Sequence, residues 1–190
     1  LVEYLRVNGF EKIYFSVGYK HEKIISYVSN KGFITPCDFI IEDEELGTGG
    51  AIKFALEKIS SESIYVFNGD TFWSEAIPKE LVQDCQSTNT LKVAVKKISL
   101  NVRYGDFLSC KEGIKIRRGS INAPIKNSNV FIGMAKVPYK FVDYCTEAKM
   151  SFEDVLQNYQ GLVRTINYFG EMLDFGTPEA FKLLKNKGFK

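Results

Sequence analysis

Ser63-Ile-Tyr-Val-Phe67, followed at once by Asn68-Gly-Asp70, is the stretch of sequence that decides the fold class. Its first five residues form a nearly continuous apolar run, which is typical of a strand covered on both faces. A polar turn then follows directly. Ligands of open α/β sheets bind beyond the carboxyl ends of the strands, so Asp70 lies where a functional carboxylate is expected.

The residues before this stretch predict alternating helices and strands. Apolar side chains at helical spacing, ended by Gly9 and Gly32, predict two helices, and short β-branched runs predict two strands. In chain order the predicted elements are a helix over 1–8, a strand over 13–17, a helix over 21–30, a strand over 37–41 and a helix over 51–59. Alternation at this spacing predicts parallel strands with right-handed crossovers.

The second half of the chain has a different pattern, because four predicted strands have little helix between them. They span 91–95, 106–110, 113–116 and 130–137. Ser151-Phe-Glu-Asp154 predicts the capped start of a helix. Residues 163–168 predict a strand, and Pro178 predicts the first turn of a final helix. The predicted fold class is α/β: a Rossmann-like, mixed and mainly parallel sheet flanked by helices, with an antiparallel extension in the second half.

Length and composition exclude several classes of protein. A chain of 190 residues fits one domain, and 45% hydrophobic and 14% aromatic residues supply a core, which argues against disorder. With 25 Lys+Arg against 23 Asp+Glu, the charge is too balanced for an obligate nucleic-acid binder. No apolar run approaches the roughly 18–20 residues of a membrane span. We therefore expect neither nucleic acid nor a membrane among its partners.

The cysteines Cys37, Cys85, Cys110 and Cys145 are scattered, and His21 is the only histidine in the sequence. This spacing argues against a zinc site and against a disulfide framework. We interpret the four residues as buried, reduced thiols of a cytoplasmic protein. G-x-S-x-G, H-E-x-x-H and Cys-His signatures are also missing, so acyl transfer and zinc hydrolysis have no support.

A glycine-rich segment, Leu46-Gly-Thr-Gly-Gly50, precedes the third predicted helix. Without Cβ atoms, its glycines would let the backbone approach a flat ligand, and a helix starting near Gly50 would offer free N–H groups. An ordinary glycine-rich turn between strand and helix explains the segment equally well. The pattern is neither G-x-G-x-x-G nor the P-loop.

Two acidic residues are candidate ligands of a metal ion. Asp70 follows the buried strand, and Asp174, in Leu173-Asp-Phe-Gly-Thr-Pro178, lies between a strand-like segment and a helix. Carboxylates at two strand ends could together hold Mg²⁺ on a phosphate. The alternatives are a solvated carboxylate in an Asn-Gly-Asp turn and a plain loop acid beside Thr177, a helix cap.

Taken in order, these segments resemble the sugar-phosphate nucleotidyltransferases over nearly the whole chain. Within that family they are most similar to heptose-1-phosphate and mannose-1-phosphate guanylyltransferases. The matching segments are Val17-Gly-Tyr-Lys20, Leu46-Gly-Thr-Gly-Gly-Ala-Ile52, Val66-Phe-Asn-Gly-Asp70, Arg103-Tyr-Gly105, Ser151-Phe-Glu-Asp154 and Asp174-Phe-Gly-Thr-Pro-Glu179.

The resemblance implies an enzyme that joins a nucleoside triphosphate, with GTP favoured, to a sugar 1-phosphate and releases pyrophosphate. Such enzymes supply precursors of bacterial surface polysaccharides, use Mg²⁺ and occur as monomers or homo-oligomers. The chemistry would be in-line attack on the α-phosphate without a covalent intermediate. By the same resemblance, the residues that would contact the nucleotide are Leu46, Gly47, Thr48, Gly49, Gly50, Asn68 and Gly69. The sugar would contact Tyr104, Gly105 and Glu153, and the metal would be bound by Asp70 and Asp174.

The sequence departs from the family pattern in three places. The triphosphate loop G-G-x-G-T-R-L is absent, so we expect a single domain lacking its first strand and phosphate loop, with the catalytic residues upstream of Leu1. The Glu-Lys-Pro motif has no match, and Arg117, Arg118 or Lys126 are candidates to replace its lysine. The family's Asn-x-Gly motif reads Phe131-Ile-Gly133 in this sequence, so phenylalanine stands in place of the asparagine.

These departures keep two other hypotheses open. The chain could be a non-catalytic subunit of the same fold that binds a nucleotide sugar for regulation or assembly. It could also be a glycosyltransferase, although Gly69-Asp-Thr71 does not supply the Asp-x-Asp metal motif of that class.

Overall fold

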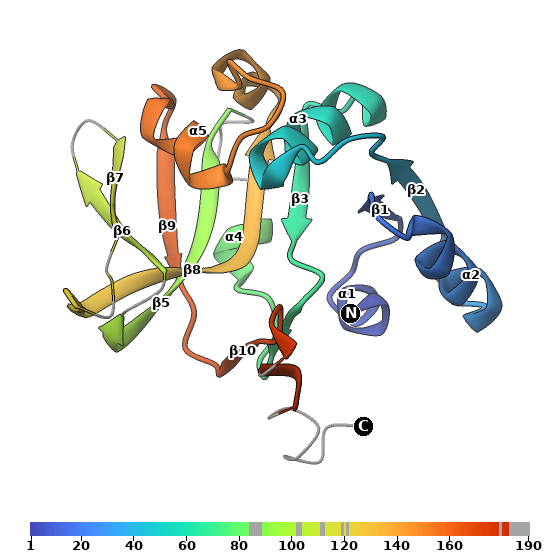
Figure 1. Cartoon of the computed structure of the whole chain (residues 1–190), viewed down its shortest axis with the longest axis horizontal. Helices are drawn as coiled ribbons and strands as arrows, with labels where there is room; N and C mark the ends of the chain where they lie inside the picture. The colour runs from blue at the N-terminus through green and yellow to red at the C-terminus, as the bar shows by residue number, and fades with distance from the viewer. Residues whose placement is uncertain are drawn as a thin grey trace. The chain divides into compact units, whose positions relative to one another are not determined.

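A computed structural model describes residues 1–83, 89–101, 104–110, 113–118, 120, 122–178 and 180–182 (Figure 1). The chain divides into two compact units, which we describe one at a time. Unit 1 comprises Leu1–Glu62 and Tyr139–Tyr159, and unit 2 comprises Ser63–Pro138 and Gln160–Lys190.

Unit 1 is built on a parallel strand pair. β1 (Ile13–Val17) pairs with β2 (Cys37–Ile41) over their full lengths, from Ile13 opposite Cys37 to Val17 opposite Ile41. The remaining elements are α1 (Val2–Val7), α2 (His21–Lys31), α3 (Gly47–Ile59), the 3₁₀ helix η1 (Tyr139–Tyr144) and α5 (Phe152–Asn158). The strands and helices predicted for 1–41 are confirmed, and α2 ends at Gly32 in the left-handed conformation that glycine favours.

The core of unit 1 lies where α3 packs against η1 and α5. Leu56, Phe141 and Val155 are completely buried, and the Phe141 ring centroid lies 5.7 Å from that of Phe152. The Ser151 side chain accepts a hydrogen bond from the Asp154 N–H at 3.1 Å, so the predicted cap of α5 is confirmed. Packing and capping together fix the segment before α5 against the start of α3.

Unit 2 contains a six-stranded sheet organised around one long strand. β8 (Ile125–Pro138) pairs with three strands, and all of these pairings are antiparallel. The described strands and the short helix of this unit are β3 (Ser63–Phe67), β4 (Thr71–Trp73), α4 (Lys79–Val82), β5 (Leu91–Asn101), β6 (Gly105–Cys110), β7 (Gly113–Arg118), β9 (Val163–Asn167) and β10 (Met172–Asp174). The sheet order is β7-β6-β8-β5-β9, with β3 added along β8, whereas β4 and β10 form a separate antiparallel pair.

The α/β class, the flanking helices and the antiparallel extension of the second half are confirmed. Parallel pairing is less frequent than predicted, since only β1–β2 and β5–β9 are parallel among the described strands. β3 pairs antiparallel with β8, whose length lets it bond to β3 and β5 on opposite edges, and the residues of β3 are half-buried rather than fully covered. α3 begins at Gly47 rather than Ala51, and β5 and β8 are longer than predicted.

Two further predictions concern membranes and the C-terminal helix. No helix in the described ranges combines the length and the apolar character that crossing a membrane requires. The predicted final helix starts at Pro178, but residue 179 and residues 183–190 fall outside what the structure describes.

Replacing Phe107 by alanine tests the core of unit 2. Phe107 is 0% exposed and its ring centroid lies 5.9 Å from that of Phe131. Because the substitution leaves a cavity, we expect a loss of about 3–5 kcal/mol in the free energy of unfolding, measured by urea titration. Phe169→Ala is the matched control, because Phe169 is 91% exposed and should change stability by less than about 0.5 kcal/mol. Equal losses for the two variants would contradict this description of the core.

Candidate active site

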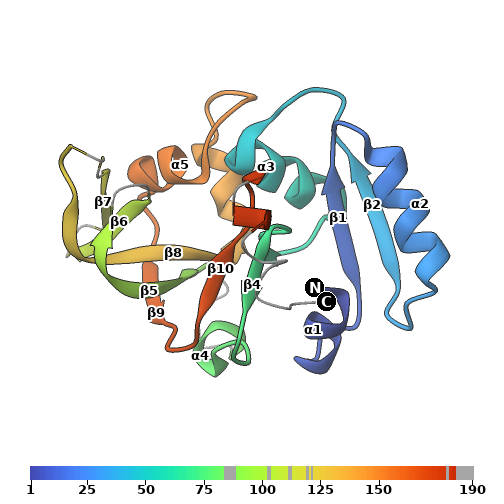
Figure 2. The ribbon, with the colours of Figure 1, turned by 60° about the horizontal axis from the view of Figure 1, so that its bottom comes forward.

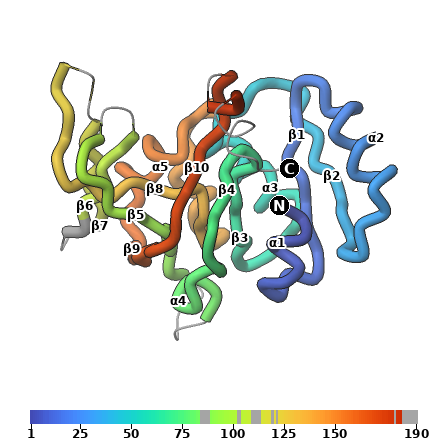
Figure 3. The backbone as a smooth tube through the Cα atoms, turned by 90° about the horizontal axis from the view of Figure 1, so that it is seen from below, coloured from blue at the N-terminus to red at the C-terminus, as the bar shows by residue number. Residues whose placement is uncertain are grey.

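The β4–β10 pair of unit 2 brings the two candidate metal ligands together. Asp174, the last residue of β10, pairs with Thr71, the residue that follows Asp70. The Phe175 N–H donates to the Asp70 carbonyl at 2.9 Å, which extends the pairing beyond the strands. Figures 2 and 3 both show β4 and β10 side by side. Two acids from distant parts of the sequence thus lie at one end of a two-stranded ribbon.

Gly176 lies against both carboxylates. A Cβ atom on this residue would overlap Asp70 Oδ2 and would lie 3.3 Å from Asp174 Oδ1, so a larger residue would have to displace the Asp70 side chain. The Gly176 N–H donates to Asp174 Oδ1 at 2.9 Å. Asp70 is exposed and Asp174 half-buried, so a ligand can reach both.

The donor chemistry of this site suits Mg²⁺. Magnesium prefers oxygen ligands and commonly takes only one or two from protein carboxylates, with phosphate and water completing the shell. Asp70 and Asp174 supply two carboxylates, and the described residues contain no cluster of three or more His, Cys, Asp or Glu side chains that could hold a metal unaided. The residues present fit a metal that is shared with a phosphate ligand.

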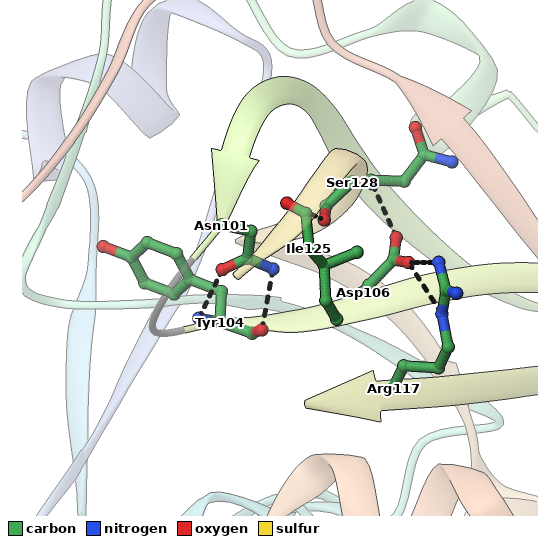
Figure 4. A network of polar contacts seen from close by, with 7 residues as sticks. Asn101, Tyr104, Asp106, Arg117, Ile125 and Ser128 are labelled. Carbon is green, nitrogen blue, oxygen red and sulfur yellow. Dashed lines mark hydrogen bonds and ion pairs between the residues drawn. The ribbon is translucent and has the colours of Figure 1, made fainter. Parts of the chain in front are cut away.

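Tyr104, which the sequence assigned to the sugar, lies beside one of these carboxylates. Its hydroxyl donates to Asp174 Oδ2 at 3.1 Å. Its main chain is held by Asn101: the Tyr104 N–H donates to Asn101 Oδ1, and Asn101 Nδ2 donates to the Tyr104 carbonyl, each at 2.8 Å (Figure 4). Sequence reasoning missed Asn101, the last residue of β5, whose role depends on these two hydrogen bonds. Gly105 begins β6, and Arg103 is outside the described residues.

Asn68 and Gly69 follow β3 in the same unit. The Asn68 N–H donates to the Gly133 carbonyl at 2.9 Å. Gly133 has φ of +76°, and a Cβ there would come within 2.7 Å of the Asn68 side chain. The glycine of the altered Asn-x-Gly motif therefore has a structural function here, which is to let Asn68 pack against β8. Gly69 is exposed, with no atom within 4 Å of its Cβ position.

The glycine-rich segment of unit 1 packs closely against its own chain. A Cβ on Gly47 would lie 2.6 Å from the Met150 carbonyl oxygen, and one on Gly49 would lie 2.7 Å from that of Ser151. The Gly49 N–H donates to the Met150 carbonyl at 2.8 Å. The Gly50 N–H donates to the same carbonyl at 3.4 Å. The expectation of free N–H groups near Gly50 is thus wrong for Gly49 and Gly50, because the segment before α5 accepts their hydrogen bonds.

The other predicted residues of unit 1 lie around the same packing contact. Leu46 precedes α3, and its carbonyl accepts from the Met150 N–H at 2.9 Å. Thr48 is exposed in the first turn of α3, and Glu153 is half-buried in the first turn of α5. Their contacts with a nucleotide or a sugar stay predictions.

Comparison with known proteins identifies the family, although no family model matches the chain. A D-glycero-α-D-manno-heptose 1-phosphate guanylyltransferase of Campylobacter jejuni is 31% identical over 95% of this chain and 80% of its own length. A protein of the same name from Aneurinibacillus thermoaerophilus is 35% identical over 94% of this chain and 79% of its own length. The chain belongs to the sugar-1-phosphate nucleotidyltransferases.

Solved structures agree with this assignment. The crystal structure of HddC from Yersinia pseudotuberculosis has a TM-score of 0.81 and 28% identity, and covers 98% of this chain and 83% of its own. The same protein complexed with GMP-PN has a TM-score of 0.79. The predicted fold and enzyme class are therefore confirmed: this nucleotidyltransferase transfers a nucleotidyl group to a sugar 1-phosphate.

Arg117, a candidate substitute for the family's missing lysine, is bound within the protein. Its guanidinium donates to Asp106 Oδ2 from Nη2 at 2.6 Å and from Nε at 3.2 Å. The ion pair joins the paired strands β6 and β7 (Figure 4). Asp106 is 1% exposed, and its Oδ1 also accepts from the Asn129 N–H of β8 at 2.8 Å, so Asp106 connects both neighbouring strands. Arg117 is nevertheless exposed, with 58% of its side-chain surface accessible to solvent. Arg118 and Lys126 are exposed.

The described cysteines fit an enzyme without a covalent intermediate. Cys145 is buried near the Phe141 carbonyl, and burial raises its pKa to about 11. Cys37 is half-buried, and burial raises its pKa as well. Neither Cys37 nor Cys145 forms a disulfide. The side chains of Cys85 and Cys110 fall outside the described residues.

Gly176→Ala tests the shared position of the two carboxylates. The added methyl group would displace the Asp70 side chain, and a shift of about 1 Å at a reacting centre can reduce the rate of nucleotidyl transfer about 100-fold. Steady-state release of pyrophosphate measures the effect. Gly18→Ala is the control, because its Cβ would meet only ordinary contacts at 3.7 and 3.8 Å. Unchanged activity of Gly176→Ala would contradict the proposed geometry.

Alkylation tests the environment of Cys145. A thiol reacts as its thiolate, and a pKa of about 11 leaves about one part in a thousand ionised at pH 8. We expect carboxymethylation of Cys145 at pH 8, followed by peptide mass spectrometry, to be at least tenfold slower in the folded protein than in urea. The folded-state rate should rise with pH toward 11. Equal rates with and without urea would exclude the buried environment.

Proposed function

We propose that this nucleotidyltransferase uses GTP and D-glycero-α-D-manno-heptose 1-phosphate, and forms the GDP-linked heptose and pyrophosphate. The names of the two relatives that are 31% and 35% identical over 95% and 94% of the chain support this substrate pair, as does the GMP-PN complex of HddC, which is 28% identical. Mannose 1-phosphate is the next candidate acceptor. The setting we infer is the supply of surface-polysaccharide precursors in a bacterial cytoplasm.

The observation that carries the proposal is the meeting of Asp70 and Asp174 at Gly176. We infer that these two residues hold Mg²⁺ together with the phosphates of the nucleotide. When bound, the ion would neutralise phosphate charge and orient the reacting groups. Both carboxylates belong to one ribbon, so their spacing is set by the β4–β10 pairing before any substrate arrives.

The reaction then needs orientation more than a protein nucleophile. An oxygen of the sugar phosphate attacks the α-phosphorus of GTP, the bond from that phosphorus to the bridging oxygen breaks, and pyrophosphate leaves. Holding the two reactants in line can supply much of the rate enhancement. Among the described cysteines, Cys145 is buried with a raised pKa, which agrees with a reaction that uses no thiolate.

The remaining site residues are proposed to contact the nucleotide or the sugar. We infer that Asn68 and Gly69 contact the nucleotide and that Gly105 and Glu153 contact the sugar. The segment 46–50 would border the base and ribose. Thr48 is exposed and available for such a contact, whereas Gly49 and Gly50 are buried against the segment before α5.

A second candidate function is a nucleotide-sugar-binding subunit without turnover. One observation favours it: Arg117, a candidate to replace the family's sugar-phosphate lysine, is bound to Asp106 instead. Binding of GDP-heptose without any product formation would support this function over catalysis.

Pyrophosphate release tests the proposal. GTP, ATP, CTP, UTP and dTTP are each combined with heptose, mannose and glucose 1-phosphates in the presence of Mg²⁺. We expect the highest kcat/KM with GTP and heptose 1-phosphate. Failure of every pair with the full-length protein would overturn the catalytic function.

Neutralising the two carboxylates tests the metal assignment. Asp70→Asn and Asp174→Asn should each lower kcat about 100- to 1000-fold, because charge stabilisation at a reacting phosphate is lost. Asp38→Asn is the matched control, since Asp38 forms an exposed ion pair with Lys12. Full activity of either active-site variant would exclude the assigned role.

A further inference from the structure

We propose that Tyr104 is a positioning residue for Asp174, and that its hydroxyl holds the carboxylate in the orientation that binds the metal. The inference rests on the proposed function, because it takes Asp174 as a metal ligand. It changes the role that the family resemblance gives to Tyr104, which is contact with the sugar.

Both carboxylate oxygens of Asp174 accept hydrogen bonds. Oδ2 accepts from the Tyr104 hydroxyl at 3.1 Å, and Oδ1 accepts from the Gly176 N–H at 2.9 Å. A carboxylate that accepts a hydrogen bond on both oxygens cannot rotate without losing a bond, so its plane is fixed. A carboxylate oxygen can accept more than one interaction, so these hydrogen bonds do not themselves exclude a cation. Partners of this kind orient metal ligands in many protein sites.

Tyr104 is in turn fixed by a buried residue. Asn101 is 1% exposed and makes two hydrogen bonds to the Tyr104 main chain, at 2.8 Å each. Asn101 also ends β5, where it pairs with Ile125 of β8. The sheet therefore holds the tyrosine backbone, and the phenol extends from it to the ribbon that carries Asp174. Figure 4 shows the Tyr104 ring pointing away from the neighbouring ion pair of Asp106 and Arg117.

The direction of the bond has a consequence for the sugar. A tyrosine hydroxyl has a single proton, and here that proton is donated to Asp174. A sugar contact of Tyr104 would use the ring or an oxygen lone pair. Loss of the hydroxyl should therefore affect metal binding more than sugar binding.

Tyr104→Phe removes the hydroxyl and keeps the ring. We expect the affinity for Mn²⁺, measured by electron paramagnetic resonance of free Mn²⁺, to fall about tenfold. The kcat should fall at low Mg²⁺ and recover as Mg²⁺ is raised, while KM for the sugar 1-phosphate stays within about twofold. Tyr27→Phe is the control, because Tyr27 is 60% exposed on α2, and it should behave as the parent. Thermal unfolding of both variants checks that they fold.

Three results would overturn the inference. If Tyr104→Phe binds Mn²⁺ as the parent does and raises KM for the sugar 1-phosphate, Tyr104 acts on the sugar alone. If Asp174→Asn also leaves Mn²⁺ affinity unchanged, the metal assignment of the proposed function fails with it. Loss of Mn²⁺ binding in Asp174→Asn with no effect of Tyr104→Phe would leave the proposed function intact and remove only the positioning role.

Discussion

The site depends on one backbone hydrogen bond, from the Phe175 N–H to the Asp70 carbonyl at 2.9 Å. This bond continues the pairing of β4 and β10 by one step, and it places Gly176 against both carboxylates. The ribbon is anchored to the sheet by Trp73, whose buried Nε1 donates to the Ile132 carbonyl at 2.8 Å. Like charges brought close together repel each other, and the shared cation that we propose would offset this repulsion.

Much of the fold could be predicted from local sequence. The strand over 13–17, the helix that Gly32 ends and the Ser151 cap each depend on residues a few positions apart, and all three are confirmed. Asp70 and Asp174 could be predicted as strand-end acids for the same reason. Their family resemblance supplied the chemistry, and the structure added that they lie side by side.

What could not be predicted depends on long-range contacts. Hydrophobicity cannot distinguish a parallel β3 from one that pairs antiparallel with β8, since both bury the same side chains. The three glycines between 47 and 50 suggested a ligand, but their neighbours are the carbonyls of residues 148–151, about a hundred positions later in the chain. Asn101 and Asp106 act through side-chain hydrogen bonds that the sequence does not reveal, so sequence reasoning found neither the role of Asn101 nor the ion pair of Arg117 with Asp106.

We propose that Asp70 and Asp174 jointly bind a divalent cation during nucleotidyl transfer. The sharpest test is anomalous diffraction from crystals grown with Mn²⁺ and a guanine nucleotide. We expect one anomalous peak bonded to a carboxylate oxygen of each residue, at the roughly 2.0–2.2 Å typical of such ligands. An ordered nucleotide with the Mn²⁺ peak away from both carboxylates would contradict it.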